Sequence, residues 1–176
     1  MAIKRELLID ILRSSFLPEL FSAGFEQADL KGPDASSREI RIAFPFGSLR
    51  RAQGQDLHLL EIQFDKHGVP RFVLNFGVVG PGGVDVPWRH FSQLEAGVSA
   101  LQESYRLYSS RHSMKWFEAS RLPFPFDVES RASNVVGRLR NVYPEVEAWF
   151  SQRVVGPHMR RLGYPIRSRE PLRSPS

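Results

Sequence analysis

The chain has 176 residues, of which 41% are hydrophobic and 24% charged, as in a single globular domain. It contains no cysteine, so disulfides, thiolate zinc sites, iron–sulfur clusters and cysteine nucleophiles are excluded. The formal net charge is +5, with 18 basic and 18 acidic residues in residues 1–150 and six arginines against Glu170 in residues 151–176. The excess positive charge therefore belongs to the C-terminal segment and not to a basic domain face.

The N-terminal segment has apolar residues at the three- and four-residue spacing of an amphipathic helix. They are Ile3, Leu7, Leu8, Ile11, Leu12 and Phe16. The spacing predicts a helix over about residues 3–23, kinked at Pro18 and stopped by Gly24. Charged residues interrupt this stretch, and no window of the chain is apolar enough to span a bilayer. We therefore expect no secretory signal, no membrane segment and a cytoplasmic location.

After a loop at 29–37, three segments alternate between apolar and other residues, namely 38–46, 57–65 and 71–79. Their apolar members are Ile40, Ile42, Phe44 and Phe46, then Leu60, Ile62 and Phe64, and last Phe72, Leu74, Phe76 and Val78. A period of two predicts three antiparallel strands, and the glycine-containing link 66–70 predicts a hairpin between the last two. We expect helices to cover the apolar face and water to cover the other face.

The next part of the chain is predicted as a loop, a helix and a short strand. Gly and Pro dominate residues 80–87, which indicates a loop. Ser92 and Glu95 have the spacing of a capping box, and apolar residues then continue at helical spacing, so a helix is predicted over 93–109. The aromatic segment 114–118 is predicted as a fourth strand.

Two helices are predicted near the C-terminus. Asp127 can cap the first, and Pro144 fits the first position of the second. Pro, Arg and Ser dominate the residues beyond, and the last eleven or so have a composition typical of disorder. The predicted organisation is one α+β domain at 1–156 followed by a tail at 157–176, with a three- or four-stranded antiparallel sheet.

Known catalytic and cofactor motifs are absent from the sequence. The glycine-rich loop at 80–83 lacks the Gly-Lys-Ser/Thr of a phosphate loop, and no Gly-x-Ser-x-Gly elbow occurs. The five histidines have no helical metal-ligand spacing. Glu61 and Asp65 share a strand face but are about 13 Å apart along the backbone, too far to share a proton. We expect no cofactor and no metal, and we favour a protein without catalytic activity.

The face of the sheet opposite the apolar one carries the predicted binding residues. They are Arg41, Glu61, Gln63, Arg71 and Asn75 on the strands, with Trp88 in the adjacent loop or Trp116 alongside. Mixed polar residues beside an aromatic side chain are typical of protein-binding surfaces. They are equally compatible with a strand face that is only solvated. The first hypothesis is therefore a protein-interaction module, whose partner and oligomeric state the sequence leaves open.

The arginine-rich tail supports a second hypothesis, a nucleic-acid accessory protein. Its candidate residues are Arg160, Arg161, Arg167, Arg169 and Arg173. This hypothesis predicts salt-dependent binding that deletion of residues 157–176 abolishes. No aromatic residue is interleaved among the last three arginines to stack on bases, which favours a merely solvated tail. A third hypothesis, an unrecognised hydrolase or transferase, requires a concave pocket with converging ionisable groups.

Three short motifs resemble a family of small bacterial domains, domain of unknown function 4304. The first is Phe16-Leu17-Pro18-x-Leu20-x3-Gly24-Phe25, the second is Gln63-Phe64 followed by Phe72–Val78, and the third is Lys115-Trp116-Phe117. The likeness spans about residues 5–155 as an order of elements. It implies an N-terminal helix, an antiparallel sheet and C-terminal helices. No catalytic residue is established for that family, so the resemblance implies none here.

Overall fold

The computed structural model describes residues 4–30, 35, 37–119 and 127–162. In these residues the chain forms an α+β fold around one antiparallel sheet of seven strands, so the expected three or four strands are too few. The strands are β1 (Glu26–Ala28), β2 (Ser48–Gln53), β3 (Asp56–Phe64), β4 (Arg71–Val79), β7 (Ser104–Leu107), β8 (Phe117–Glu118) and β9 (Met159–Arg161). Their order is β1-β2-β3-β4-β7-β9, and β8 pairs with the start of β4.

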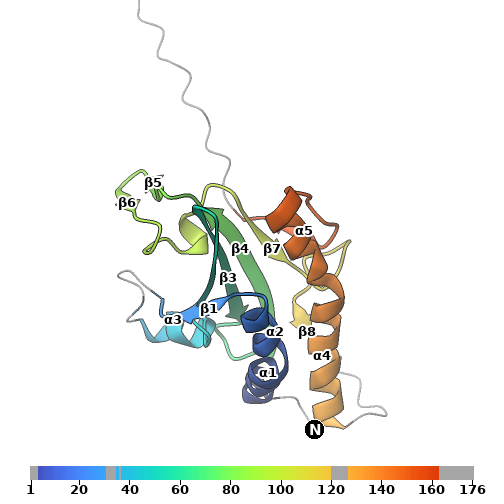
Figure 1. Cartoon of the computed structure of the whole chain (residues 1–176). Helices are drawn as coiled ribbons and strands as arrows, with labels where there is room; N and C mark the ends of the chain where they lie inside the picture. Colours follow the sequence, from blue (N-terminus) through green and yellow to red (C-terminus); the bar gives the residue numbers. More distant parts are fainter. Residues whose placement is uncertain (1–3, 31–34, 36, 120–126, 163–176) are drawn as a thin grey trace, which may run out of the picture.

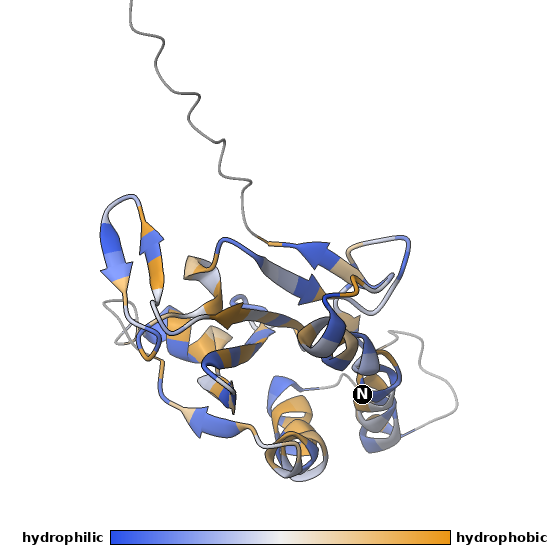
Figure 2. Cartoon of the chain, turned by 45° about the horizontal axis from the view of Figure 1, so that its top comes forward, coloured by the Kyte–Doolittle hydropathy of each residue, from blue (hydrophilic) through white to orange (hydrophobic). Residues whose placement is uncertain are grey.

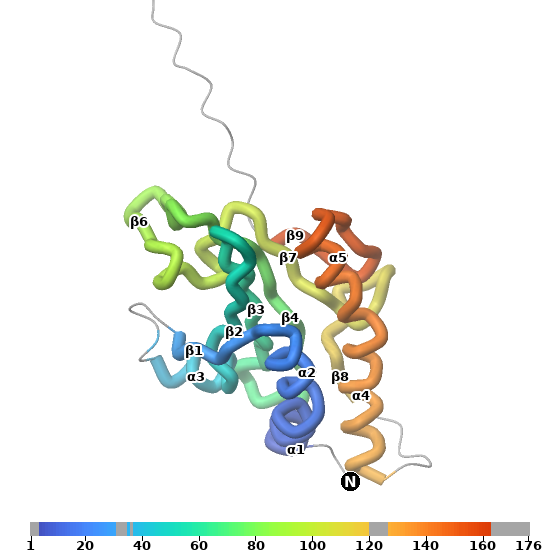
Figure 3. Tube along the Cα trace, in the orientation of Figure 1, coloured from blue at the N-terminus to red at the C-terminus, as the bar shows by residue number. Residues whose placement is uncertain are grey.

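Helices from both ends of the chain cover one face of this sheet (Figure 1; Figure 3). They are α1 (Arg5–Ile11), a π-helical segment η1 (Leu12–Phe16), α2 (Leu17–Ser22), α4 (Val128–Val142) and α5 (Pro144–Gln152). Their ribbons carry hydrophobic and hydrophilic positions together, as amphipathic helices do (Figure 2). The predicted N-terminal and C-terminal helices are thereby confirmed.

The N-terminal helix adopts the π conformation just before the predicted kink at Pro18. Proline has no N–H to donate to the preceding turn, so the helical ladder is interrupted there. The Leu17 N–H bonds the carbonyl of Leu12, five residues back. The Arg140 side chain of α4 donates to the Ser15 carbonyl at 2.7 Å. The distortion is therefore stabilised by a contact with the helix packed beside it.

The central hairpin of β3 and β4 confirms two of the predicted strands. Leu60 lies opposite Phe76, Ile62 opposite Leu74 and Phe64 opposite Phe72. All six side chains are at most 1% exposed and belong to the main core, together with residues of α1, α4 and α5. Burying each such side chain contributes about 1.5–3 kcal/mol. The predicted apolar face is thus the buried face.

The predicted strand at 38–46 is wrong. Residues Arg38–Ala43 form a short helix, α3, and the strand that pairs with β3 begins at Ser48. Between them Gly47 has φ +64°, and a Cβ there would lie 2.5 Å from the Ala28 carbonyl oxygen. A short apolar segment suits a helix as well as a strand, and here contacts with distant residues select the helix. Arg41 therefore lies exposed on α3 and not on the sheet.

The predicted helix at 93–109 is also wrong. Ser92 and Glu95 form one half of the capping box, with the Ser92 N–H donating to Glu95 Oε2 at 3.2 Å and the Ser92 Oγ donating to the same oxygen at 2.7 Å. The chain then makes only a 3-10 turn, η3 (Val98–Ala100), before it enters β7. The helix does not form because residues 96–101 instead pack on the face of the sheet that the helices leave uncovered, against Leu59 and Val79.

The loop prediction at 80–87 is wrong for Val84–Val86, which form strand β5. This strand pairs with β6 (Arg89–Phe91) in a separate hairpin that stands away from the sheet in Figure 1. The strand predicted at 114–118 is reduced to β8. Strand β9 lies inside the segment predicted as the tail, and it forms an edge of the sheet by pairing with β7. Arg167, Arg169 and Arg173 lie outside the described residues.

Candidate functional site

The second face of the sheet is divided into a covered part and an open part. Leu59 and Val79 in the covered part form a second core with Ala96, Val98 and Leu101. The sequence predicted this whole face to be solvated, which is wrong for the covered part. A segment that appeared helical in sequence instead lies across the strands and supplies the apolar contacts.

Glu61 is buried beneath this segment, with only 5% of its surface exposed. Its Oε1 accepts a hydrogen bond from the Val98 N–H at 3.1 Å. Burial raises the pKa of Glu61 to about 7, against the lowering effects of that hydrogen bond and of Arg50. Arg50 in turn donates to the carbonyls of Leu94 and Ala96 at 2.5 and 3.4 Å. Both charged residues thus anchor the covering segment and are not available to a ligand.

The open part contains a hydrogen-bonded triad from three neighbouring strands. Asn75 Nδ2 donates to Gln63 Oε1 at 2.8 Å. Arg106 Nε donates to Asn75 Oδ1 and Arg106 Nη2 donates to Gln63 Oε1, both at 2.7 Å. The register places Asn75 directly opposite Arg106, so the contacts follow from strand pairing. Gln63 Oε1 thus accepts two hydrogen bonds and Asn75 Oδ1 accepts one, whereas Gln63 Nε2 and Arg106 Nη1 donate to no residue that the structure describes.

Trp116 joins this triad to Arg71. The guanidinium carbons of Arg71 and Arg106 lie 5.1 and 5.9 Å from the Trp116 ring centroid, within cation–π range. Arg71 also donates through Nε and Nη2 to Asp65 Oδ2, at 3.0 and 2.6 Å. Burial acts to raise the pKa of Asp65, but hydrogen bonds from Arg71 and from the His67 N–H outweigh it and leave the pKa lowered.

We call this part the arginine–tryptophan surface and define it as the partly exposed Gln63, Arg71, Arg106 and Trp116. Asn75 is only 4% exposed and holds Gln63 and Arg106 together through its hydrogen bonds. Beside the arginine–tryptophan surface lies a hollow of about 450 Å³, lined by Arg71, Met114, Lys115, Trp116, Glu118 and Arg138 among others. Ser109 lines it too, but its hydroxyl donates to the carbonyls of Lys115 and Trp116 at 3.1 and 2.9 Å. Among the described residues that hydroxyl therefore bonds to two backbone carbonyls and to no histidine or carboxylate.

The structure brings together Gln63, Arg71, Asn75 and Trp116 of the residues predicted for binding. Glu61 lies on the same face but is buried, and Arg41 lies on α3. Trp88 is 81% exposed in the turn between β5 and β6, outside the arginine–tryptophan surface.

Sequence reasoning missed Arg106, because it assigned the segment to a helix. The signal available was the short alternation of buried Tyr105 and Leu107 with Arg106 between them.

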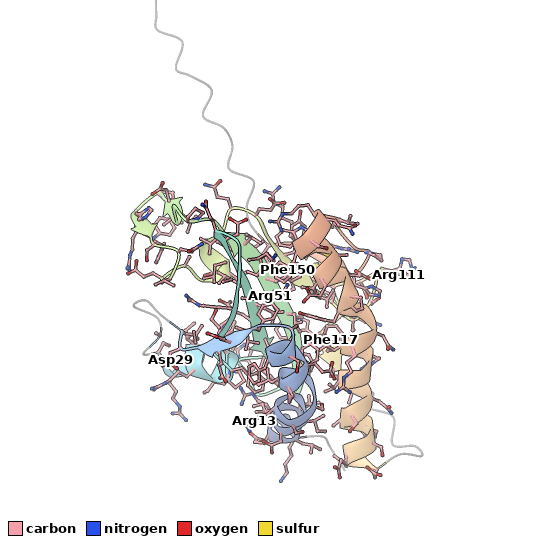
Figure 4. The ribbon with its side chains drawn as sticks, viewed as in Figure 1. Arg13, Asp29, Arg51, Arg111, Phe117 and Phe150 are labelled. Atoms are coloured by element: carbon pink, nitrogen blue, oxygen red, sulfur yellow. The ribbon has the colours of Figure 1, made fainter. Side chains whose placement is uncertain are left out.

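A second cluster of polar residues lies on the helix-covered face and has a structural role. Arg51 donates to both carboxylate oxygens of Glu147 on α5, at 3.1 and 2.8 Å, and its Nη2 lies 3.2 Å from His58 Nδ1. The His58 ring stacks on Phe150 at 4.3 Å between centroids. Desolvation, aided by Arg51 and Arg153, lowers the pKa of His58 to about 4. Arg51 and Phe150 lie close together between the sheet and α5 in Figure 4, and the cluster fixes that helix to the sheet.

The two tail arginines that the structure describes are both on β9. Arg160 Nη2 donates to the Arg111 carbonyl at 2.5 Å, and Arg161 Nη2 donates to the Gln102 carbonyl at 3.2 Å. Both side chains are exposed but bonded to neighbouring loops. In the register of β7 and β9, Arg160 lies directly opposite Arg106 and so adjoins the surface that contains Arg106, whereas Arg161 lies opposite Tyr105.

Comparison of the chain with protein-family models, with curated proteins and with solved structures finds no match. The resemblance to domain family 4304 stays a prediction. Over the described ranges, no helix is both long enough and apolar enough to cross a membrane. In the same residues no three histidine, aspartate or glutamate side chains cluster in a way that would hold a metal ion.

Proposed function

We propose that this protein is an interaction module that binds an acidic segment of another protein at the arginine–tryptophan surface. The observation that supports the proposal is the one-sided hydrogen bonding of the triad. Gln63 Oε1 accepts two hydrogen bonds within the triad and Asn75 is buried, so the polar atoms left for a partner are N–H donors of Gln63 and Arg106. A surface of donors fits a partner that offers acceptors, and carboxylates are the strongest acceptors in proteins.

The charge of the surface supports the same partner chemistry. Asp65 offsets the charge of Arg71 through a 2.6 Å ion pair. Arg106 forms no ion pair with any carboxylate that the structure describes, and its only side-chain partners there are the two amides and Trp116. The surface is therefore left with a positive charge that a partner carboxylate can neutralise, with the planar fork that suits bidentate contacts.

A protein partner is favoured over a nucleic acid at this surface because of the state of Trp116. Recognition of single strands uses open aromatic faces on which bases stack. Two guanidinium groups already lie within 6 Å of the Trp116 ring centroid, so the ring serves to hold arginines in place. Aromatic residues combined with arginines are also enriched at the centres of protein interfaces.

Selection of displayed random peptides on the full chain tests the proposal. We expect the wild-type protein to enrich acidic peptides, and we expect Arg106→Gln to weaken their binding about tenfold or more, the effect of one charge-assisted hydrogen bond. Arg111→Gln is the matched control. It removes the same charge from an exposed side chain that projects at the outer side of the molecule (Figure 4) and has no hydrogen bond to the described residues.

Two outcomes would contradict the proposal. One is the absence of acidic enrichment on the wild-type protein. The other is enrichment that Arg106→Gln and Arg111→Gln affect equally, because binding would then depend on net charge alone. Circular dichroism of both variants checks that the fold is kept. Binding of a single-stranded oligonucleotide that is insensitive to Arg106→Gln would favour the nucleic-acid hypothesis instead.

A further inference from the structure

The hollow beside β8 shares Arg71 and Trp116 with the arginine–tryptophan surface. We propose that it binds the C-terminal residue of the acidic partner segment, with the terminal carboxylate on its cationic side and the apolar side chain on its aromatic side. This inference rests on the proposed function and names the part of the partner that occupies the hollow. The two features that support it are an excess of cations and an adjacent apolar wall.

The cationic side is formed by Lys115 and Arg138 beside the one lining carboxylate of Glu118, with Arg71 next to them, whose charge Asp65 offsets. Arg138 projects from α4 and donates to the backbone carbonyl of Glu118. It forms no ion pair with a carboxylate of the described residues, and desolvation lowers its pKa from the ordinary arginine value. A guanidinium whose surroundings disfavour its charge is stabilised when an anion binds beside it.

The apolar side is formed by Met114, Trp116 and Ala119. Met114 is 68% exposed, so its side chain is open to contact with a ligand. A ligand that fills this hollow therefore needs a carboxylate directly next to an apolar group. The C-terminal residue of a peptide meets that need, because its carboxylate and its side chain are attached to the same carbon. A glutamate within a chain does not, because only its own methylenes stand beside the carboxylate and no separate apolar side chain is attached to the carbon that carries it.

The hollow also has the position that such a peptide requires. Arg106 contacts Trp116 from the surface, and Arg71 lies over the same ring while lining the hollow. Acidic residues bound at Arg106 would be followed, a few residues further along, by the end of the peptide at Arg138. Capture of a terminal carboxylate is a known mode of peptide recognition, and it gives specificity for chain ends.

Binding of one acetylated peptide in two forms tests the inference. The peptide is Glu-Glu-Asp-Glu-Leu, prepared as the free acid and as the C-terminal amide, and its affinity for the full chain is measured by fluorescence polarisation. We expect the wild-type protein to bind the acid about tenfold more tightly than the amide. Arg138→Gln should remove this preference, whereas Arg106→Gln should weaken both forms alike. Arg111→Gln should leave the preference unchanged.

The outcomes separate the inference from the proposed function. Equal affinities of wild type for acid and amide, both reduced by Arg106→Gln, would overturn the inference and leave the proposed function standing. A preference for the acid that Arg138→Gln preserves would also overturn the inference. Failure of both peptides to bind would contradict the proposed function, and the hollow would then be judged by a measurement that needs no peptide.

That measurement uses the indole N–H signals in the nitrogen-15 spectrum. The chain has three tryptophans, so Trp116 can be followed beside exposed Trp88 and buried Trp149. N-acetyl-leucine should shift the Trp116 signal and leave the other two in place, whereas neutral N-acetyl-leucinamide should shift none. A Trp116 signal that both compounds shift equally, or that neither shifts, would overturn the inference. Trp116→Phe assigns the signal.

Discussion

Glu61 is an ionisable residue at a position that disfavours charge. The strand pattern placed it correctly on the second face of the sheet, beside residues that do form the arginine–tryptophan surface. Its side chain is nonetheless buried under Val98, to whose N–H it is bonded. The same local pattern thus includes exposed and buried residues, because burial here depends on a segment that is more than thirty residues away in the chain.

Replacement of this residue by Glu61→Gln should change how stability depends on pH. The pKa of Glu61 is 4.5 in its ordinary state and about 7 in the folded protein. Because the folded-state pKa is the higher one, the contribution of Glu61 to stability is full below about pH 4.5 and is lost as pH rises to about 7. Gln stays neutral and can still accept a hydrogen bond from the Val98 N–H. The free energy of unfolding of the variant should therefore rise relative to that of the wild type over this pH window, by about 3 kcal/mol at most.

Urea unfolding at several pH values on both sides of the window measures this effect. Glu39→Gln, at an exposed position on α3, is the control and should leave the pH dependence unchanged. If the difference in unfolding free energy between wild type and Glu61→Gln were constant across the window, the burial of this carboxyl in the folded protein would be refuted.

The residues of the candidate surface were only partly accessible to sequence reasoning. Gln63, Arg71 and Asn75 were found because they alternate with apolar residues on two strands whose pairing is local. Arg106 is 31 residues from Asn75 and 43 from Gln63, so its contribution depends on a strand pairing that no local pattern reveals. Arg41 was wrongly included because its segment is helical.

At the scale of elements, two glycines differ in what surrounds them. Gly77 lies in β4, where an added Cβ would meet Leu101 Cδ1 at 2.5 Å and the Glu103 carbonyl oxygen at 3.1 Å. Gly137 lies within α4, and an added Cβ there would meet nothing within 4 Å. The first glycine allows the segment before β7 to approach the sheet closely, whereas the second only weakens a helix.

The two alanine substitutions should therefore have opposite effects. Gly77→Ala forces the Leu101 side chain to move and crowds the Glu103 carbonyl oxygen, and should destabilise the fold by about 1–3 kcal/mol. Gly137→Ala reduces the backbone freedom of the unfolded chain and should stabilise it by about 0.5–1 kcal/mol. Thermal and urea unfolding give both values. A neutral Gly77→Ala would contradict the packing of residues 96–103 on the second face of the sheet.

The elements that sequence reasoning misassigned share a physical property. The helix α3 and the segment around η3 are short, so their own hydrogen bonds and propensities stabilise them little. The contacts that select their conformation come from other elements: the Ile42 carbonyl at the end of α3 accepts from Arg5, and Val98 packs on β3 and β4. The prediction of the longer helix α4 was correct because its apolar stripe and its cap are local features. The cap is Asp127, whose carboxylate accepts from the Ser130 N–H at 2.7 Å.

For the whole molecule, the boundary between the folded part and the tail can be tested by truncation. Met159 in β9 is 2% exposed and belongs to the main core, and His158 Nδ1 lies 2.5 Å from Glu145 Oε1 on α5. A chain that ends at Leu162 keeps all of these contacts and should have the melting temperature of the full chain. A chain that ends at Gly156 lacks them and should be less stable by about 2–5 kcal/mol, as when a large core side chain is removed.

Calorimetry of the two truncated chains measures the difference. Equal melting temperatures for both would show that β9 contributes nothing to the fold. The comparison also matters for the nucleic-acid hypothesis, because deletion of residues 157–176 removes an edge strand as well as the tail. Deletion of residues 163–176 alone removes Arg167, Arg169 and Arg173 without touching the sheet.

Local sequence patterns were enough to predict the α+β class, the β3–β4 hairpin, the apolar face of the sheet and the helices at both ends. Each of these depends on residues within one turn or one hairpin of each other, where periodicity reports directly on burial. Contacts between distant segments set the number of strands, the covering of half of the second face and the meeting of Arg106 with Gln63 and Asn75. Such contacts join residues far apart in the chain, and short segments adopt whichever conformation those contacts stabilise.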